Sequence, residues 1–296
     1  MTEKYLVAID AGTGSGRCLV FNTLGEEIAS STREWTHETI PKYPGSQVFD
    51  TTKNWKLLCE CAQETLQKAK ISPRGVAAVS ATSMREGMVL YDRNGKEVWA
   101  CPNADARAAE EVTELTRKGL SKKIYFTAGD WPSIIDPPRF LWIKKHQPEI
   151  FGKISHMTML SDWILYKLSG RFTTEPSIGS SSGMFDLKKR TWSRSIIEWC
   201  DLPIDIFPQI TEAGAPIGEV TEKAAAETGL KKGTPVVMGG ADTQLGLIGV
   251  DAVKPAHVTV IGGTFWQQTI TTTTPVIDPQ SRVRTLCHAI PDQWMT

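Results

Sequence analysis

Asp10 follows a short apolar segment and precedes a turn rich in glycine and hydroxyl groups. The segment YLVAI (5–9) comes before it, and AGTGSGR (11–17) comes after it. Glycine-rich turns can present backbone N–H groups to phosphate oxygens. Thr13 and Ser15 add hydroxyl donors, and a carboxylate beside them can hold a hydrated magnesium ion. The stretch therefore predicts an anion-binding turn with a metal-binding carboxylate.

Three nucleotide-binding arrangements place a glycine-rich turn after a strand, and spacing separates them. A P-loop needs Lys followed by Ser or Thr after its last glycine, whereas Gly16 is followed here by Arg17 and Cys18. A dinucleotide-binding fingerprint needs G-x-G-x-x-G at the start of a helix, whereas this stretch continues into CLVF, a strand pattern. A β-hairpin with a phosphate-binding turn remains. The alternative is an ordinary glycine-rich hairpin in which Asp10 is bonded locally.

Arg85 and Glu86 form a second candidate site, after the apolar strand GVAAVSAT (75–82). Ligands of open α/β sheets collect at the carboxyl ends of the strands. An arginine that donates beside a glutamate that accepts can bind a polyhydroxylated substrate. The alternative is a solvated charged turn.

Asp242 is a third candidate, at the predicted start of a helix in VVMGGADTQLGLIG. The two glycines before it allow a ligand to approach the backbone closely. The helix dipole should keep its carboxylate ionised, so that it can accept a proton from a substrate hydroxyl as a general base. The alternative is a carboxylate that only complements the helix dipole.

The segment IGGTFW (261–266) resembles the first turn, with Thr264 in the place of Thr13. It is a candidate for a second phosphate turn, and a plain glycine hairpin is the alternative. Trp131 and Trp266 are expected in the core more often than in a substrate platform.

Strands and helices that alternate along the chain predict an α/β domain. YLVAI should be a central strand covered on both faces, because its apolar run is continuous. Apolar residues recur at helical spacing in 52–70. The further predictions are a hairpin at 88–100 with an Asn-Gly turn, helices at 104–117, 137–146 and 157–168, and a turn and strand at 232–240 that lead into a helix.

The composition restricts the partners. Lys+Arg and Asp+Glu both number 33, so the formal charge is zero, which argues against nucleic-acid binding and gives no attraction to an anionic membrane. No apolar run reaches the length of a membrane span, and the first residues do not fit a signal peptide. The six cysteines are scattered among 296 residues, which favours a cytoplasmic protein without disulfides or a zinc site.

In order along the chain, DAGTGSGR, SMREG, NADARAAEE, SDWILYKLSGRFTTEPSIGSSSGMFD, GGADTQLGLIG and GGTFWQQ resemble the FGGY family of carbohydrate kinases. Within that family, SMREG, NADARAAEE and GGTFWQQ are most similar to the subgroup of autoinducer-2 kinases, which phosphorylate a short branched polyhydroxy ketone. The resemblance implies two ribonuclease-H-like domains of the actin, hexokinase and Hsp70 type, with the active site between them.

The resemblance also implies a role for each candidate residue in a kinase that uses ATP and Mg²⁺ on a small sugar-like substrate. Asp10 would organise Mg²⁺, and Asp242 would deprotonate the attacking hydroxyl. Arg85, Glu86, Asp242 and Thr243 would bind the substrate. The nucleotide phosphates would be contacted by Gly12, Thr13, Gly14, Ser15 and Arg17. Gly263 and Thr264 would contact the nucleotide from the opposite wall of the cleft between the two domains.

Three positions depart from the pattern of many relatives. Gly14 stands where many carry Thr, Met84 where many carry Gln, and Thr243 where some carry Gln. The last two remove amide contacts and make a simple polyol such as glycerol a less suitable substrate.

The expected domains are 1–250, a first kinase domain, and 251–296, the beginning of a second. We therefore expect a truncated chain that is inactive by itself. The remaining alternatives are another pentulose or polyol kinase, an actin- or Hsp70-like ATPase, and a sugar-binding fragment without catalysis. The sequence predicts neither the exact substrate nor the oligomeric state.

Overall fold

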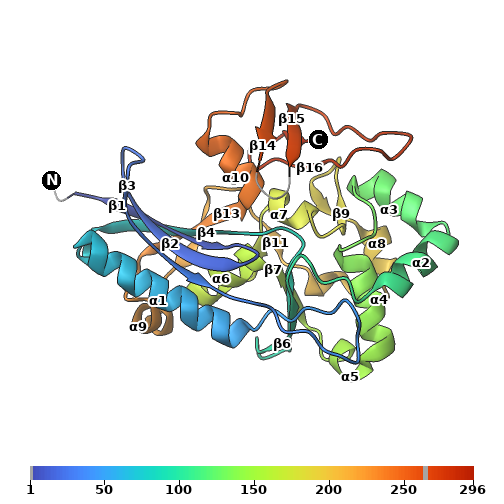
Figure 1. The fold of residues 1–296 in the computed structure, drawn as a ribbon, viewed down its shortest axis with the longest axis horizontal. Helices are drawn as coiled ribbons and strands as arrows, with labels where there is room; N and C mark the ends of the chain where they lie inside the picture. Colours follow the sequence, from blue (N-terminus) through green and yellow to red (C-terminus); the bar gives the residue numbers. More distant parts are fainter. Residues whose placement is uncertain (1–2, 263–265) are drawn as a thin grey trace.

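A mixed six-stranded sheet occupies the left part of the molecule as drawn in Figure 1. The computed structural model describes residues 3–262 and 266–296. The strands follow the order β12-β13-β4-β1-β2-β3. Their bounds are β1 (Tyr5–Ala11), β2 (Ser15–Asn22), β3 (Glu27–Glu34), β4 (Val76–Ser83), β12 (Pro216–Glu219) and β13 (Pro235–Ala241).

The six strands of this sheet do not all run in the same direction. Strands β1, β2 and β3 are antiparallel, whereas β4 runs parallel to β1 and β13 runs parallel to β4. Asp10 of β1 lies opposite Thr82 of β4, which in turn lies opposite Gly240 of β13. The carboxyl ends of three parallel strands therefore meet at one edge of the sheet.

Three helices cover one face of this sheet (Figure 1): α1 (Thr51–Ala69), α6 (Leu160–Ser169) and α9 (Glu222–Thr228). The expectation that YLVAI is covered on both faces is wrong. Val7 and Ile9 are buried, but Leu6 is 42% exposed, because burial alternates along β1. On the other face, α10 (Asp242–Gly249) contacts β13 and β4.

A second hydrophobic core lies beside the sheet and is built from helices and a three-stranded sheet. Strand β5 (Met88–Tyr91) pairs with β6 (Glu97–Cys101), as the predicted hairpin requires, and with β7 (His156–Met159). The predicted helix at 157–168 is therefore partly wrong, because its first residues complete this sheet and α6 begins at Leu160. The helices here are α2 (Ala109–Arg117), α3 (Leu120–Ala128), α4 (Asp136–His146), α5 (Pro148–Phe151) and α8 (Arg194–Trp199).

The C-terminal residues form a separate four-stranded sheet next to α10 (Figure 1). Its order is β14 (Val258–Ile261), β15 (Gln267–Thr272), β17 (Trp294–Met295) and β16 (Leu286–Cys287). The short helix α7 (Pro176–Ser180) lies between this sheet and β13 and contacts both β13 and β16. Two short ladders complete the fold: β8 (Thr173–Thr174) with β11 (Gln209–Ile210), and β9 (Phe185–Asp186) with β10 (Thr191–Trp192), together with the 3₁₀ turns Pro73–Gly75 and Ile204–Ile206.

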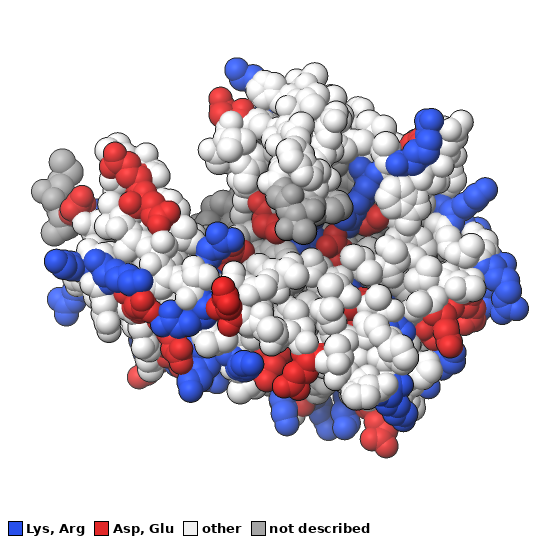
Figure 2. Space-filling view, viewed as in Figure 1, with Lys and Arg blue, Asp and Glu red and all other residues white. Residues whose placement is uncertain are grey.

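The described residues carry charges of both signs and six buried cysteines. Basic and acidic side chains are interspersed over the face drawn in Figure 2. Within residues 3–262 and 266–296, no helix is both long and apolar enough to pass through a bilayer. All six cysteines lie in the described ranges, and each is buried with a free thiol.

Gly239 is expected to be intolerant of any side chain. A Cβ at this position would lie 1.8 Å from the backbone oxygen of Ala81 on β4, so Gly239→Ala must push β13 away from its neighbour. We expect a loss of about 1–3 kcal/mol in the free energy of unfolding, measured by denaturant titration. Gly246→Ala is the control, since a Cβ there has open space in a helix and should be neutral or stabilising. Equal effects of the two changes would contradict the prediction.

Candidate functional site

Asp10 lies at the end of β1, directly opposite Arg17 in the hairpin. The Arg17 Nε atom is 2.9 Å from Asp10 Oδ2, whereas Asp10 Oδ1 is buried and has no hydrogen-bond partner among the described residues. The pKa of Asp10 is raised to about 6, mainly because burial disfavours its charged form and also because of the charge of Asp242, while Arg17 opposes the rise. A carboxylate oxygen that is buried and unpartnered is suited to a cation.

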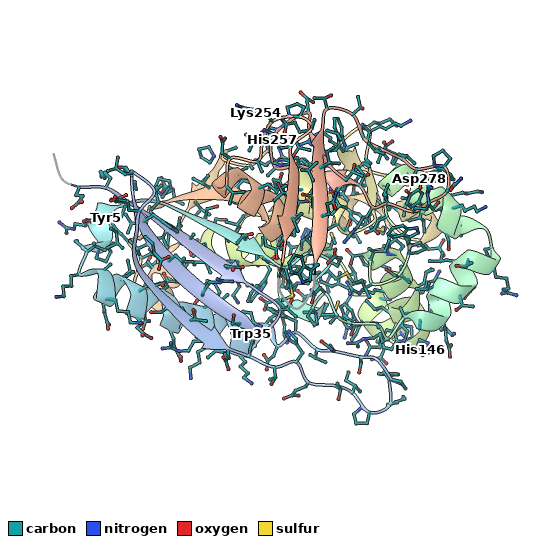
Figure 3. The ribbon with its side chains drawn as sticks, turned by 45° about the horizontal axis from the view of Figure 1, so that its top comes forward. Tyr5, Trp35, His146, Lys254, His257 and Asp278 are labelled. Carbon is teal, nitrogen blue, oxygen red and sulfur yellow. The ribbon has the colours of Figure 1, made fainter. Side chains whose placement is uncertain are left out.

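The turn after Asp10 is a β-hairpin turn, as predicted. Its carbonyl oxygens accept hydrogen bonds from other residues of the protein. Gly12 N–H donates to Ser15 O at 2.9 Å, and Trp35 N–H donates to Gly14 O at 3.0 Å. The Trp35 indole N–H lies 3.2 Å from both Gly12 O and Thr13 O, and His37 Nε2 is 2.9 Å from Thr13 O. Trp35 follows β3 directly and is labelled in Figure 3.

This arrangement leaves amide donors available. Among the residues that the structure describes, the backbone N–H groups of Thr13 and Gly14 have no hydrogen-bond acceptor. Carbonyl oxygens repel phosphate, and here they are occupied by Trp35 and His37. The turn can therefore act as an anion-binding nest.

Two further residues act on this turn. Asn103 Nδ2 donates to Thr13 Oγ1 at 3.1 Å and fixes the threonine side chain, a role that the sequence analysis did not assign. Arg17 is half exposed and forms an ion pair with Asp10. This ion pair would have to break before Arg17 could make its predicted contact with phosphate.

Asp242 is the first residue of α10, as predicted. Its Oδ1 atom accepts hydrogen bonds from Thr243 N–H at 2.6 Å and Thr243 Oγ1 at 3.3 Å. Asp242 is exposed, but the protein around its carboxylate partly desolvates it and raises its pKa, while Arg85 and the Thr243 backbone oppose the rise. The helix start therefore does not dominate its ionisation. A raised pKa makes the carboxylate a stronger base.

Asp10 and Asp242 approach one another because their strands are two apart in the sheet. Neighbouring strands lie about 4.8 Å apart, so the two backbones are separated by about 10 Å. The charge of Asp242 reaches Asp10 strongly enough to raise its pKa. The two carboxylates thus lie at the same edge of the sheet.

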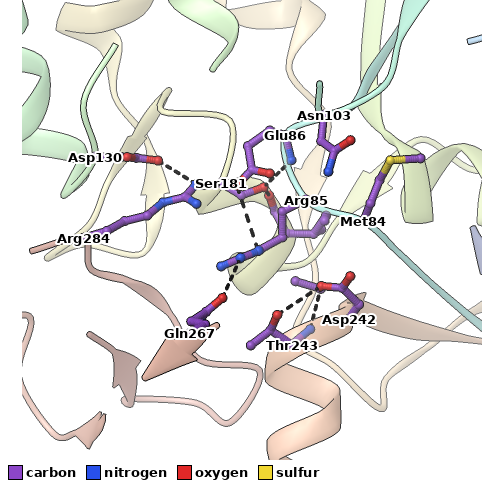
Figure 4. A network of polar contacts seen from close by, with 12 residues as sticks. Met84, Arg85, Glu86, Asn103, Asp130, Ser181, Asp242, Thr243, Gln267 and Arg284 are labelled. Atoms are coloured by element: carbon purple, nitrogen blue, oxygen red, sulfur yellow. Dashed lines mark hydrogen bonds and ion pairs between the residues drawn. The ribbon is translucent and has the colours of Figure 1, made fainter. Parts of the chain in front are cut away.

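Arg85 and Glu86 do not form a solvated turn. Glu86 is 5% exposed, with a left-handed backbone (φ 59°) that is rare for a residue with a side chain. Arg85 Nη2 donates to Gln267 Oε1 at 3.1 Å, and Arg85 Nε is 3.9 Å from Glu86 Oε1. Figure 4 shows Arg85 between Gln267 and Glu86, with Asp242 close by.

Arg284 joins two buried carboxylates (Figure 4). Its Nη2 atom lies 2.5 Å from Glu86 Oε1 and 2.6 Å from Asp130 Oδ2. Arg139, which is itself buried, donates to the Glu86 carbonyl oxygen. The sequence analysis missed Arg284, Asp130 and Arg139, because the residues next to them in the sequence do not indicate partners that lie far away in the chain.

A pocket of about 490 Å³ adjoins these residues, and a small sugar would fit it. Arg85 is part of its wall and Asp242 is not. Its lining residues are Arg85, Trp131, Gln267, Gln268, Thr269, Ile270, Val283, Arg284, Leu286, Met295 and Thr296. Trp131 and Trp266 are 37% and 71% exposed, so the expectation that they lie in the core is wrong.

Two predicted nucleotide contacts, Gly263 and Thr264, lie outside the described residues. The strands on either side, β14 and β15, pair in antiparallel fashion. Within the described ranges, no group of three or more metal-binding side chains occurs. Mg²⁺ keeps several waters and often uses one or two carboxylates, so Asp10 with its unpartnered oxygen still fits such a site.

The residues 5–249 match the model of the N-terminal domain of the FGGY family of carbohydrate kinases. The chain belongs to this family. It is 44% identical over 295 residues to autoinducer-2 kinase from Salmonella typhimurium strain LT2, and 45% identical over 293 residues to autoinducer-2 kinase from Escherichia coli strain SMS-3-5. These matches cover 99% and 98% of the chain but only 56% and 55% of the relatives, so the chain spans about half of their length.

Solved structures confirm the fold. Xylulose kinase from Rhodospirillum rubrum has a TM-score of 0.90 at 23% identity, and the match covers 99% of this chain and 59% of that one. Glycerol kinase from Plasmodium falciparum, solved with ADP, has a TM-score of 0.87 at 18% identity, with 99% and 60% covered. The predicted resemblance to sugar kinases, and within them to autoinducer-2 kinases, is confirmed.

Proposed function

We propose that the full-length protein transfers the γ-phosphoryl group of ATP to a primary hydroxyl of a small sugar-like substrate. The observation that carries this proposal is the meeting of Asp10 and Asp242 at one sheet edge, beside a turn with free amide donors. Membership of a carbohydrate kinase family supports it.

Asp242 accepts the proton of the attacking hydroxyl, and its raised pKa suits that task. Arg85 and Glu86 orient the substrate, with Arg85 donating to hydroxyl oxygens and Glu86 accepting from hydroxyl groups. The amides of Thr13 and Gly14 stabilise negative charge on the phosphate oxygens, which is the main demand of phosphoryl transfer.

Asp10 is the residue that would hold Mg²⁺, which neutralises charge on the phosphates when bound. Gly12, Ser15 and Arg17 complete the proposed phosphate turn. Gly263 and Thr264 are proposed to contact the nucleotide from the opposite wall, and Thr243 to assist at the substrate. The proposed division into domains 1–250 and 251–296 places that wall in the second domain.

We propose the linear form of the autoinducer-2 precursor, a dihydroxypentanedione, as the substrate. Identity of 44–45% to autoinducer-2 kinases supports it. The test is a kinase assay of the full-length gene product with this compound, xylulose, gluconate and glycerol. A preference of at least about tenfold in kcat/KM for the dihydroxypentanedione is expected. Preference for xylulose would favour a pentulose kinase instead, and ATP hydrolysis indifferent to every sugar would favour an actin- or Hsp70-like ATPase.

Asp10→Asn is expected to weaken binding of Mg-ATP by about tenfold or more, since the amide cannot replace a metal-binding carboxylate. Binding of the sugar should change little. Isothermal titration of the full-length gene product with each ligand measures both. Asp205→Asn, at an exposed aspartate of the turn Ile204–Ile206, is the control. Unchanged Mg-ATP affinity in the Asp10 variant would remove Asp10 from the nucleotide site.

A further inference from the structure

Three buried serines at and beside α7 contact three different parts of the site. We call Ser177, Ser180 and Ser181 the serine cluster. They come from the segment PSIGSSSG (176–183), and none of the three has any exposed surface. The proposed reaction gives them no role, and a buried hydroxyl is retained without cost only when it is hydrogen-bonded.

Each hydroxyl of the serine cluster donates its proton to an acceptor that is nearby in the chain, within residues 175–178. Ser177 Oγ donates to Glu175 Oε2, the side chain that caps α7. Ser180 Oγ donates to Ser177 O at 3.1 Å, and Ser181 Oγ donates to Ile178 O at 2.7 Å. Because each hydroxyl has a single proton, these bonds leave the oxygen lone pairs to accept from outside the segment.

The accepted bonds come from three distant segments. Ala241 N–H donates to Ser177 Oγ at 3.0 Å, and Ala241 directly precedes Asp242. Glu86 N–H donates to Ser181 Oγ at 3.3 Å, at the residue with the left-handed backbone (Figure 4). Cys287 N–H donates to Ser180 Oγ at 3.0 Å, three residues after Arg284.

The end of β13 is adapted to this contact. A Cβ at Gly240 would lie 2.8 Å from Ser177 Oγ and 2.7 Å from Glu175 Oε2. The bare glycine therefore allows the strand that carries Asp242 to approach the serine cluster.

From these contacts we infer that the serine cluster positions the base and the substrate residues relative to one another. Ser177 sets the backbone of Asp242, and Ser181 sets that of Glu86, while Ser180 holds the segment that carries Arg284. They are positioning residues, since no bond of theirs reaches a reacting atom. This inference rests on the proposed roles of Asp242 and Glu86.

The positioning of Asp242 by Ser177 and that of Glu86 by Ser181 should affect different kinetic constants. Ser177→Ala is expected to lower kcat by between about tenfold and about a hundredfold, because small displacements of a catalytic group are costly, and to leave the KM for the sugar within about threefold. Ser181→Ala is expected to raise the KM for the sugar by about tenfold. Both are measured on the full-length gene product with saturating Mg-ATP.

Ser182→Ala is the matched control. Ser182 is equally buried, donates to Gly179 O at 2.6 Å and accepts from Met184 N–H at 3.0 Å, so all its side-chain bonds are local. Its kcat and KM should stay within about twofold of the unaltered protein, although the loss of thermal stability should resemble that of the other two variants. Equal kinetic losses in all three would overturn the inference and indicate a purely structural role.

Amide hydrogen exchange, measured by mass spectrometry, tests the positioning role of the serine cluster independently of enzyme activity. Ser177→Ala should speed exchange at Ala241 and not at Glu86, and Ser181→Ala should do the reverse. Unchanged exchange at both amides would overturn the inference. If the Ser177 variant does not fold, the Ser181 variant and its control decide alone. Should the unaltered protein phosphorylate no sugar, the proposed function fails while the exchange data still test the cluster.

Discussion

Asp242→Asn is expected to lower kcat by a factor of about 100 to 10,000, which is the usual contribution of a general base. Asparagine keeps an oxygen for the hydrogen bond from Thr243 N–H, so the start of α10 should remain intact. Sugar affinity should change by less than about threefold. Steady-state kinetics and calorimetry of the full-length gene product measure the two quantities.

Asp251→Asn provides the comparison for this change. Asp251 lies just beyond the other end of α10, is exposed and has a left-handed backbone (φ 56°) that asparagine accepts readily. Its kcat should equal that of the unaltered protein. Turnover of the Asp242 variant within about tenfold of normal would mean that the proton leaves by another route.

Arg284→Met should be the most destabilising change at the site. Glu86 and Asp130 are 5% and 3% exposed, and both are paired with this guanidinium. Removing one partner of buried charges costs about 3–5 kcal/mol, and the partial exposure of Arg284 reduces our expectation to about 2–4 kcal/mol. Denaturant unfolding at neutral pH measures the loss.

The pH dependence of this loss has a defined sign. Burial already raises the pKa of Asp130, and Arg284 opposes that rise. Without Arg284, the pKa of Asp130 in the folded protein rises further above its value in the unfolded chain. The folded state then binds more protons than the unfolded state as the pH falls, and this stabilises it. The defect should therefore be largest at neutral pH and shrink on acidification.

Arg282→Met is the control for Arg284. Arg282 is two residues away and pairs with Asp278 at 2.8 Å, but its side chain is 69% exposed. An exposed pair is worth at most about 1 kcal/mol. A loss of the same size in both variants, or a defect in the Arg284 variant that does not vary with pH, would show that the buried carboxylates do not depend on Arg284.

The sequence predicts the central sheet well because period and turn chemistry are local signals. The strands around Asp10, the hairpin at Asn94-Gly95 and the start of α10 all follow from a few adjacent residues. Where the predictions were wrong, contacts with residues far away in the sequence determined the structure. His156–Met159 joins β5 as an edge strand although its neighbours favour helix. Leu6 is apolar but faces the side of the sheet that fewer helices cover.

The candidate site was predictable only where glycine marks a turn. Asp10, Glu86 and Asp242 each adjoin such a turn, and the fold brings them to one edge. Trp35, Asn103, Arg284 and the serine cluster could not be assigned in this way, because their roles depend on partners far away in the chain. Arg284 and Glu86, for example, are 198 residues apart.

The burial of every thiol makes the folded chain unusually convenient for spectroscopic labelling. Desolvation raises the pKa of five of the six cysteines to about 12 and raises that of Cys61 as well, so scarcely any reactive thiolate exists at neutral pH. Maleimide dyes will then react with a cysteine introduced on the surface and spare the native ones. A donor and an acceptor fluorophore, one near β3 and one near β14, could then measure the distance between these two strands without removal of any natural residue.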